Sequence, residues 1–223
     1  HIMPIYNRIA DFHEDLVATR RDIHAHPELG FEEHRTSDLV AQQLESWGIE
    51  VHRNIATTGV VGVLKGSGNS ERSIGLRADM DALPMDEEGT PEHRSKNAGK
   101  MHACGHDGHT TMLLGAARYL AETKNFDGTV HFIFQPAEEG GGGGRVMVEE
   151  GLFDKFECDT VWGMHNSPNL PAGTLAIRPG PLMAAVDMAK ITINAQGCHA
   201  AQPHMGKDPI AVSYTHLRAH ETE

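Results

Sequence analysis

The sequence lacks the features that mark membrane, secreted and nucleic-acid-binding proteins. No apolar run approaches the roughly 18 residues needed to cross a bilayer, and no basic region followed by an apolar stretch opens the chain. Lys and Arg number only 19 against 31 Asp and Glu, and this net charge of -12 repels a polyphosphate backbone. Cysteine is scarce, at three scattered residues, which excludes a disulfide-stapled miniprotein and suits a reducing cytoplasm. We therefore expect a cytoplasmic protein with no nucleic-acid partner and no membrane segment.

Histidine, by contrast, is frequent, at 16 of 223 residues. Hydrophobic residues make up 39% of the chain and charged residues 22%, which is the balance of a globular protein rather than a disordered one. The length suits one large domain or one and a half. A neutral surface has little use for so many imidazoles, so the composition points to metal or proton chemistry.

Hydrophobic spacing predicts alternating helices and strands. Apolar residues at helical spacing predict four helices, over residues 9–26, 37–47, 110–124 and 145–150. Short apolar stretches predict four buried strands, over residues 59–64, 73–78, 129–134 and 160–164. Strand, helix and strand in this order are typical of an α/β sheet with parallel strands. The five consecutive glycines at 140–144 predict a loop.

The pattern changes after Gly173. Alternation of apolar and polar residues over 174–178 and 187–194 predicts a half-exposed antiparallel sheet. We therefore expect a domain boundary within 180–186. Asp208 and Pro209 then fit the N-cap and first position of a last helix.

A thiol, three imidazoles and a carboxylate lie within nine residues, 101–109, just before a predicted helix. Soft and borderline ligands this close together suit zinc or a similar transition metal. Cys104 and His106 are two residues apart, so both side chains can point to the same side of an extended turn. The alternative is a buried core thiol beside surface histidines, which is the better explanation for a lone residue but not for this cluster.

Further ligand-type side chains follow two of the other predicted strands. Glu138 and Glu139 come after 129–134, and since neighbouring side chains diverge, one can ligate a metal ion while the other takes a proton from water. Taken alone, such a pair is usually part of a solvated loop. His165 follows 160–164, and taken alone it is more often a core residue than a ligand.

Asp79 and Asp81 follow the predicted strand 73–78. They can bridge metal ions or hold a ligand imidazole in its tautomer, and a structural turn is an equal alternative. In an open α/β sheet, sites form at the carboxyl ends of the strands. We therefore expect the side chains that follow these strands to converge at one edge of the sheet.

Six segments carry a resemblance to a known family: HAHPELGFEE (24–33), RADMDALP (77–84), MHACGHDGHTTMLLGAA (101–117), FQPAEEGGGG (134–143), GMHN (163–166) and GCHAAQPH (197–204). Together they resemble the peptidase M20 family, and more narrowly its amidohydrolase branch, which includes hippurate hydrolases and N-acyl-amino-acid amidohydrolases. The resemblance implies an α/β fold, a three-layer α/β/α zinc-peptidase-like catalytic domain that is incomplete here, over 4–183. It also implies the start of an inserted α+β lid or dimerisation domain, over 184–212.

The resemblance also implies roles for individual residues. It places metal ligands at four positions: Cys104, His106, Glu139 and His165. Glu138 falls on the general base, and His199, in the lid domain, falls on a histidine that stabilises the developing oxyanion. Asp79 and Asp81 are expected to contact the ligand side chains and to hold them in place.

The implied reaction is hydrolysis of the amide bond of a small N-acyl amino acid such as hippurate. Two divalent metal ions lower the pKa of a bound water, Glu138 accepts its proton, and the proton then passes to the leaving amine. Zinc or manganese fits the ligands best, and cobalt and nickel stay open. A homodimer is implied for the full-length form.

The sequence departs from the family pattern at three points. Family members are longer, and their returning segment supplies a final metal-ligand histidine, so we expect this chain to be a fragment with little or no hydrolysis of N-acyl amino acids. The string SYTHLRAHET resembles a translated sequencing adapter, so residues 213–223 are expected to be a non-native tail. Cys198 stands where the family usually has glycine before the lid histidine.

Three other readings stay open. The first is a dipeptidase or carboxypeptidase of the same family, which would share most of the metal chemistry. The second is a non-catalytic metal-binding module. The third is a cysteine hydrolase with Cys104 as nucleophile and His106 or His109 as base, which would leave the glutamate pair without a role.

Overall fold

The computed structural model describes residues 7–184 and 189–217. The chain divides into two compact units, 1–174 and 175–223, and each is described by itself. The boundary between the units falls between Thr174 and Leu175, whereas the sequence places the second domain from residue 184 onward. The domain assignment itself stays a prediction.

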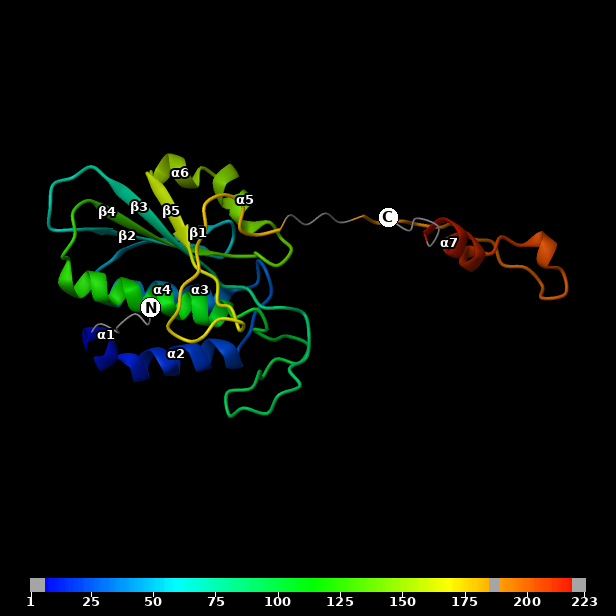
Figure 1. The fold of residues 1–223 in the computed structure, drawn as a ribbon, viewed down its shortest axis with the longest axis horizontal. Helices are drawn as coiled ribbons and strands as arrows, with labels where there is room; N and C mark the ends of the chain where they lie inside the picture. Colours follow the sequence, from blue (N-terminus) through cyan, green and yellow to red (C-terminus); the bar gives the residue numbers. More distant parts are fainter. Residues whose placement is uncertain (1–6, 185–188, 218–223) are drawn as a thin grey trace. The chain divides into compact units, whose positions relative to one another are not determined.

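The described part of the first unit is built around one five-stranded sheet in the order β1-β2-β4-β3-β5 (Figure 1). Its strands are β1 (Glu50–Ile55), β2 (Gly59–Lys65), β3 (Ser73–Asp79), β4 (Thr129–Gln135) and β5 (Thr160–Gly163). Its helices are α1 (Asn7–Asp11), α2 (His13–Ala25), α3 (His34–Ser46), α4 (His106–Thr123), α5 (Gly143–Glu149) and α6 (Leu152–Lys155). Helices α3 and α4 pack on one face of the sheet, and α5 and α6 pack on the other. This confirms the expected three-layer α/β/α architecture.

The pleat of the strands divides the core between these two faces. In β4, Phe132 and Phe134 pack with residues of α3 and α4, whereas Ile133 between them packs with residues of α5 and α6. All three side chains are at most 2% exposed. Burial on both faces explains why these strands appear in the sequence as continuous apolar runs.

The sheet is mixed, with a parallel part and an antiparallel part. β3 runs parallel to β4 and to β5, as predicted for strands on either side of α4. β2 is antiparallel to both β1 and β4. β1 and β2 form a hairpin over the short turn at 56–58, and a turn this short can join only antiparallel strands. β1 itself was not predicted, because its sequence EVHRNI is largely polar, as suits a strand at the sheet edge.

Several helices differ in their bounds from the prediction. The helix expected over 9–26 divides at Phe12 into α1 and α2. α3 begins at His34, three residues before the expected start. α4 begins at His106 rather than at 110, so part of the histidine-rich motif lies inside the helix. The glycine run is a loop only as far as Gly142, and α5 starts at Gly143.

The second unit has little regular structure in its described residues. It holds a short 3-10 turn, Pro203–Met205, and helix α7, Pro209–Leu217. α7 begins as the sequence predicts, because Oδ1 of Asp208 accepts a hydrogen bond from the backbone N–H of Ile210 at 2.8 Å. The helix extends into the segment that we expected to be a non-native tail, whose origin stays a prediction.

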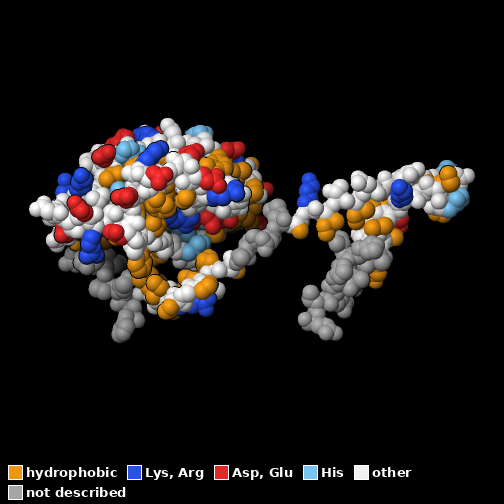
Figure 2. Space-filling view, turned by 90° about the horizontal axis from the view of Figure 1, so that it is seen from above, with side chains coloured by type: hydrophobic (Ala, Val, Ile, Leu, Met, Phe, Trp, Pro, Cys, Tyr) orange, Lys and Arg blue, Asp and Glu red, His pale blue; other side chains and the backbone are white. Residues whose placement is uncertain are grey.

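The antiparallel sheet expected in this unit is not formed by its described residues. Segments 174–178 and 189–194 carry no strand, and residues 185–188 lie outside the described part. Leu175 and Ile177 are 62% and 78% exposed. A half-exposed strand is stable only beside a neighbouring strand, and neither described segment has one. Hydrophobic side chains are accordingly visible along this unit in Figure 2.

The face of the first unit that Figure 2 shows is mixed in charge. Figure 2 shows acidic side chains spread over the visible face, with lysine and arginine between them. Among the described helices, none combines the length and the apolar composition that a bilayer crossing requires.

Candidate metal centre

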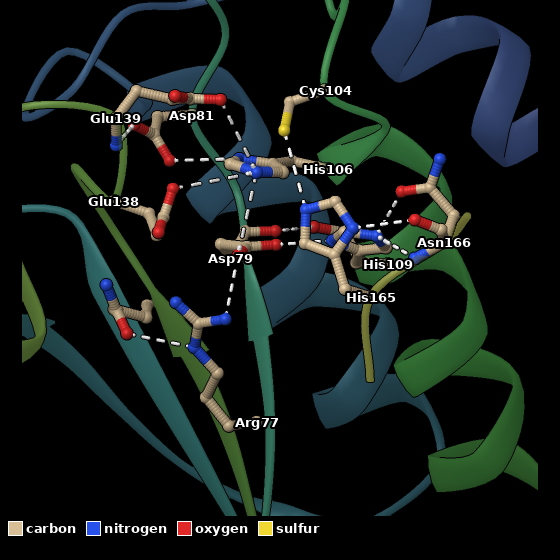
Figure 3. A network of polar contacts seen from close by, with 12 residues as sticks. Arg77, Asp79, Asp81, Cys104, His106, His109, Glu138, Glu139, His165 and Asn166 are labelled. Carbon is tan, nitrogen blue, oxygen red and sulfur yellow. Dashed lines mark hydrogen bonds and ion pairs between the residues drawn. The ribbon is translucent and has the colours of Figure 1, made fainter. Parts of the chain in front are cut away.

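The carboxyl ends of three parallel strands meet at one edge of the sheet, as the sequence predicts. Asp79 at the end of β3 pairs with Gln135 at the end of β4, and Arg77 pairs with Gly163 at the end of β5. The segments that follow these strands bring together Asp79, Asp81, Glu138, Glu139 and His165 (Figure 3). The predicted convergence is therefore confirmed within the first unit.

The N-terminal end of α4 supplies the thiol and the first imidazole of the site. Between Cys104 and His106, Gly105 adopts a left-handed conformation with φ of +91°. A Cβ at this position would lie 2.6 Å from the side chain of Asn166, so only glycine fits. This turn directs the sulfur of Cys104 and the ring of His106 into the same space.

His106 lies at the centre of the site with one ring nitrogen unpaired. Its Nδ1 is 3.2 Å from Oδ1 of Asp81, which fixes the ring orientation. Its Nε2 is buried without a hydrogen-bond partner among the described residues. Carboxylate oxygens of three residues surround this nitrogen at 3.6 to 3.9 Å: Asp79, Glu139 and Glu138. An unpaired buried lone pair facing several carboxylates is the environment that a metal ion would satisfy.

His165 also presents a nitrogen to the site. Its Nδ1 lies 2.7 Å from the backbone oxygen of Asn166 and donates its proton there, because a carbonyl can only accept. The lone pair is therefore on Nε2, which lies 3.4 Å from Sγ of Cys104. His165 is exposed, unlike His106.

The donor atoms fit divalent cations. Three sets have their ligand atoms within 4.8 Å of one another: Cys104, His106 and His165; His106, Glu138 and Glu139; and Asp79, His106 and His109. Two ligands of one zinc ion, each bound at about 2.0 to 2.3 Å, are separated by distances of this order. Oε1 of Glu139, like Nε2 of His106, is buried without a hydrogen-bond partner in the described residues. Thiol, imidazole and carboxylate together are a donor set for divalent transition metals.

The thiol of Cys104 is poorly suited to act as a free nucleophile. Burial raises its pKa, and the nearby carboxylates of Glu139, Glu138 and Asp79 raise it further, to about 12. A reactive cysteine needs a lowered pKa. This environment speaks against the cysteine-hydrolase alternative, and a bound cation would supply the positive charge that favours the thiolate.

We expect Cys104 to resist alkylation when metal is withheld. At pH 8, a thiol with a pKa near 12 is thiolate in only about one molecule in 10⁴. Iodoacetamide in the presence of a chelator should therefore label the exposed Cys198 first and Cys104 last. Peptide mass spectrometry over a time course gives the order, and rapid labelling of Cys104 would revive the cysteine nucleophile.

Asp79 is held as a carboxylate by its neighbours. Burial alone would raise its pKa, but the hydrogen bond from His109 and the positive charge of Arg77 outweigh burial and lower the pKa to about 2. Nδ1 of His109 lies 2.6 Å from one carboxylate oxygen, and a guanidinium nitrogen of Arg77 lies 2.7 Å from the other. These contacts lie directly beneath His106 (Figure 3).

This pairing predicts acid sensitivity. Because the folded pKa lies below the ordinary value near 3.8, Asp79 stabilises the fold above about pH 4 and loses this effect as the pH falls toward 2. The contribution is on the order of 2 kcal/mol. Urea unfolding with a chelator present should show the stability difference between wild type and Asp79→Asn shrinking over that pH range. A difference that does not vary with pH would contradict the pairing.

Two residues of the site, His109 and Asn166, were given no part in the metal centre by the sequence analysis. His109 lies between Asp79 and Asn166, whose backbone nitrogen is 3.0 Å and whose side-chain oxygen is 2.6 Å from Nε2 of His109. With both ring nitrogens engaged, His109 holds the segment that carries His165. A helix predicted to start at His106 rather than at residue 110 would have revealed His109. His106 and His109 then lie about one turn apart on the same face of the helix.

His199 lies in the second compact unit, residues 175–223. Its Nδ1 accepts a hydrogen bond from the backbone N–H of Ala201 at 3.1 Å. The side chain is exposed. Its expected action on the oxyanion therefore stays a prediction.

Known proteins resemble this chain in sequence. The profile of peptidase family M20/M25/M40 matches residues 75–221. A hippurate hydrolase of Campylobacter jejuni is 49% identical over 208 residues, which cover 93% of this chain and 54% of that protein. The IAA-amino acid hydrolase ILR1-like 4 of Arabidopsis thaliana is 46% identical over 96% of this chain and 49% of its own length. The chain thus spans about half the length of these curated relatives.

Solved structures share the fold. The YXEP protein of Bacillus subtilis, described as a dinuclear metal binding peptidase from the M20 family, matches with a TM-score of 0.73 and 42% identity, over 78% of this chain and 48% of its own. A putative aminohydrolase of methicillin-resistant Staphylococcus aureus matches with a TM-score of 0.77 and 32% identity, over 96% of this chain and 56% of its own. With the profile match and the gathered ligand set, the chain belongs to peptidase family M20/M25/M40.

Proposed function

We propose that the protein is a metal-dependent amidohydrolase that cleaves the amide bond of small N-acyl amino acids. One observation carries the proposal: two buried atoms without hydrogen-bond partners in the described residues, Nε2 of His106 and Oε1 of Glu139, lie 3.7 Å apart beside the carboxylate of Glu138. Relatives named hippurate hydrolase and N-acetyl-L-cysteine deacetylase support this substrate class.

Four residues would hold two divalent cations: Cys104, His106, Glu139 and His165. The burial of the two glutamates supports different roles for them, because the side chain of Glu139 is 22% exposed and that of Glu138 is 43% exposed. The backbone N–H of Glu139 also donates to Oδ2 of Asp81 at 2.9 Å, which steadies Glu139 as a ligand. Glu138 keeps the freedom to move a proton.

The cations, when bound, acidify water and polarise the scissile carbonyl. Glu138 accepts the proton of the attacking water and delivers it to the nitrogen of the leaving amino acid. Asp81 and Asp79 keep His106 oriented through both reaction steps. His199 would stabilise the oxyanion that forms on the acyl oxygen.

The donor set fits zinc or manganese best, and cobalt and nickel are compatible with the same residues. We also propose that the working form is a cytoplasmic homodimer.

A carboxypeptidase is the second candidate, because two thermostable carboxypeptidases of Saccharolobus solfataricus are 43% identical to this chain. A carboxypeptidase and an amidohydrolase would share the same metal ligands and the same general base. The two activities would differ in which side of the scissile amide carries the group that the enzyme recognises. A non-catalytic metal-binding module would keep the ligands without turnover.

The substrate class is tested on a hybrid in which this chain replaces the matching segment of the Campylobacter jejuni relative, 54% of whose length it covers. Loaded with Zn²⁺ or Mn²⁺, the hybrid should release glycine from hippurate faster than it cleaves unblocked dipeptides. Faster cleavage of longer peptides than of N-acyl amino acids would favour the carboxypeptidase. Metal binding without any turnover would favour the binding module.

A further inference from the structure

We propose that Glu33 is a positioning residue of this site, whose buried carboxylate fixes the turn that presents Glu138 and Glu139. The inference rests on the proposed function for the roles of those two glutamates. It gives a purpose to the segment HAHPELGFEE (24–33), to which the sequence assigned none.

Glu33 joins two segments that are distant in the chain. One of its carboxylate oxygens accepts a hydrogen bond from the backbone N–H of Ala137 at 2.8 Å. The other accepts a hydrogen bond from the hydroxyl of Thr58 at 2.5 Å. The side chain is fully buried, at 0% exposure, so these contacts are not exchanged with water. Burial raises the pKa of Glu33, and a carboxylate buried in this way costs free energy unless it is hydrogen-bonded.

The turn that Glu33 holds is a strained one. Ala137 has a φ of +49°, a left-handed conformation that a residue with a Cβ rarely adopts. It precedes Glu138 directly, so its backbone angles set the direction of both glutamates. Gly30 packs against it so closely that a Cβ on Gly30 would lie 2.9 Å from Cα of Ala137.

The turn is fixed at both ends by carboxylates. Glu33 binds the N–H of Ala137 at its start, and Asp81 binds the N–H of Glu139 at its end. Asp81 also contacts His106, so its removal would disturb a ligand directly. Glu33 makes no hydrogen bond to a ligand side chain; it acts on the site through the turn and through its charge interaction with Asp81.

The same N-terminal segment supports the other loops of the site. The backbone oxygen of Glu28 accepts the N–H of Ala82, next to Asp81, at 2.8 Å. Nδ1 of His24 lies 2.8 Å from a carboxylate oxygen of Asp107, next to His106. Segment 24–33 thus contacts several of the loops that carry the site residues. Through Glu33 it contacts the turn that precedes Glu138 and Glu139.

The test compares three variants of the 223-residue chain in two assays. Glu33→Leu removes both acceptors, Glu33→Gln keeps an oxygen for Ala137 and offers its amide to Thr58, and Thr58→Val removes only the hydroxyl. Hydrogen exchange at the Ala137 amide is measured with a chelator present, and Zn²⁺ affinity is measured by competition. Melting temperatures identify variants that do not fold.

We expect Glu33→Leu to speed exchange at Ala137 at least about tenfold and to weaken Zn²⁺ binding about 10- to 100-fold, the range typical of residues behind a metal ligand. Glu33→Gln should restore both values to within about threefold of wild type. Thr58→Val should lower the melting temperature but leave exchange at Ala137 and Zn²⁺ affinity unchanged. If Glu33→Leu does not fold, Glu33→Asp, one methylene shorter, serves as the loss variant.

Unchanged exchange and affinity in a folded loss variant would overturn the inference, as would a Glu33→Gln protein as impaired as Glu33→Leu. Failure of the proposed function is distinguishable. In that case wild type binds no Zn²⁺, or the metal-loaded hybrid shows no turnover, while the exchange assay still decides whether Glu33 holds the turn.

Discussion

His106→Ala is expected to weaken Zn²⁺ binding by about 100-fold or more. This is the largest effect on Zn²⁺ affinity that we expect of any single substitution in the site. His106 belongs to all three ligand sets, and its Nε2 has no other partner among the described residues. Supporting residues behind a ligand already cost about 10- to 100-fold when changed, and loss of the ligand itself costs at least as much. Competition against a chromogenic chelator measures the affinity directly.

His52→Ala is the matched control. His52 is a half-buried histidine of β1, with 41% of its side chain exposed, that pairs with Glu50 at 2.9 Å and belongs to none of the ligand sets. It should leave Zn²⁺ affinity unchanged. If His106→Ala binds Zn²⁺ as tightly as His52→Ala does, the ion is held elsewhere.

The second large effect separates the two glutamates. Glu138→Gln should lower kcat of the hybrid enzyme by about 10²- to 10⁴-fold, the range for loss of a general base, while metal content stays at the wild-type value. Glu139→Gln should instead lower metal affinity first, because its buried oxygen faces His106. Steady-state kinetics on hippurate and metal analysis of the same preparations distinguish the two.

The assignment would be reversed by the opposite outcome. If Glu138→Gln lost metal and Glu139→Gln kept metal but lost turnover, the ligand and the base would exchange places. The greater exposure of Glu138 is the structural reason to expect the first outcome.

The sequence predicted the site edge well because that prediction needs little geometry. Apolar strands that end at or just before Asp79, Glu138 and His165 share one direction in the parallel part of the sheet, so their ends meet at one edge. The short spacing between Cys104 and His106 likewise limits where their side chains can go. Both features depend on short segments of the chain, so they can be predicted without knowing the contacts between distant residues.

Other features depended on contacts that no local pattern records. Glu33 and Ala137 are 104 residues apart, and the contact follows from the packing of Gly30 against the turn. The early start of α4 depends on the left-handed Gly105, whose requirement for glycine comes from Asn166 across the site. Alternation at 174–178 predicted a strand, but alternation describes a face and supplies no neighbouring strand.

X-ray absorption spectroscopy of the zinc-loaded chain tests the convergence of thiol, imidazole and carboxylate most directly. The account predicts a sulfur scatterer at about 2.3 Å together with nitrogen or oxygen at about 2.0 to 2.2 Å, and loss of the sulfur alone in Cys104→Ser. A first shell without sulfur in the wild-type protein, or one unchanged in Cys104→Ser, would contradict it.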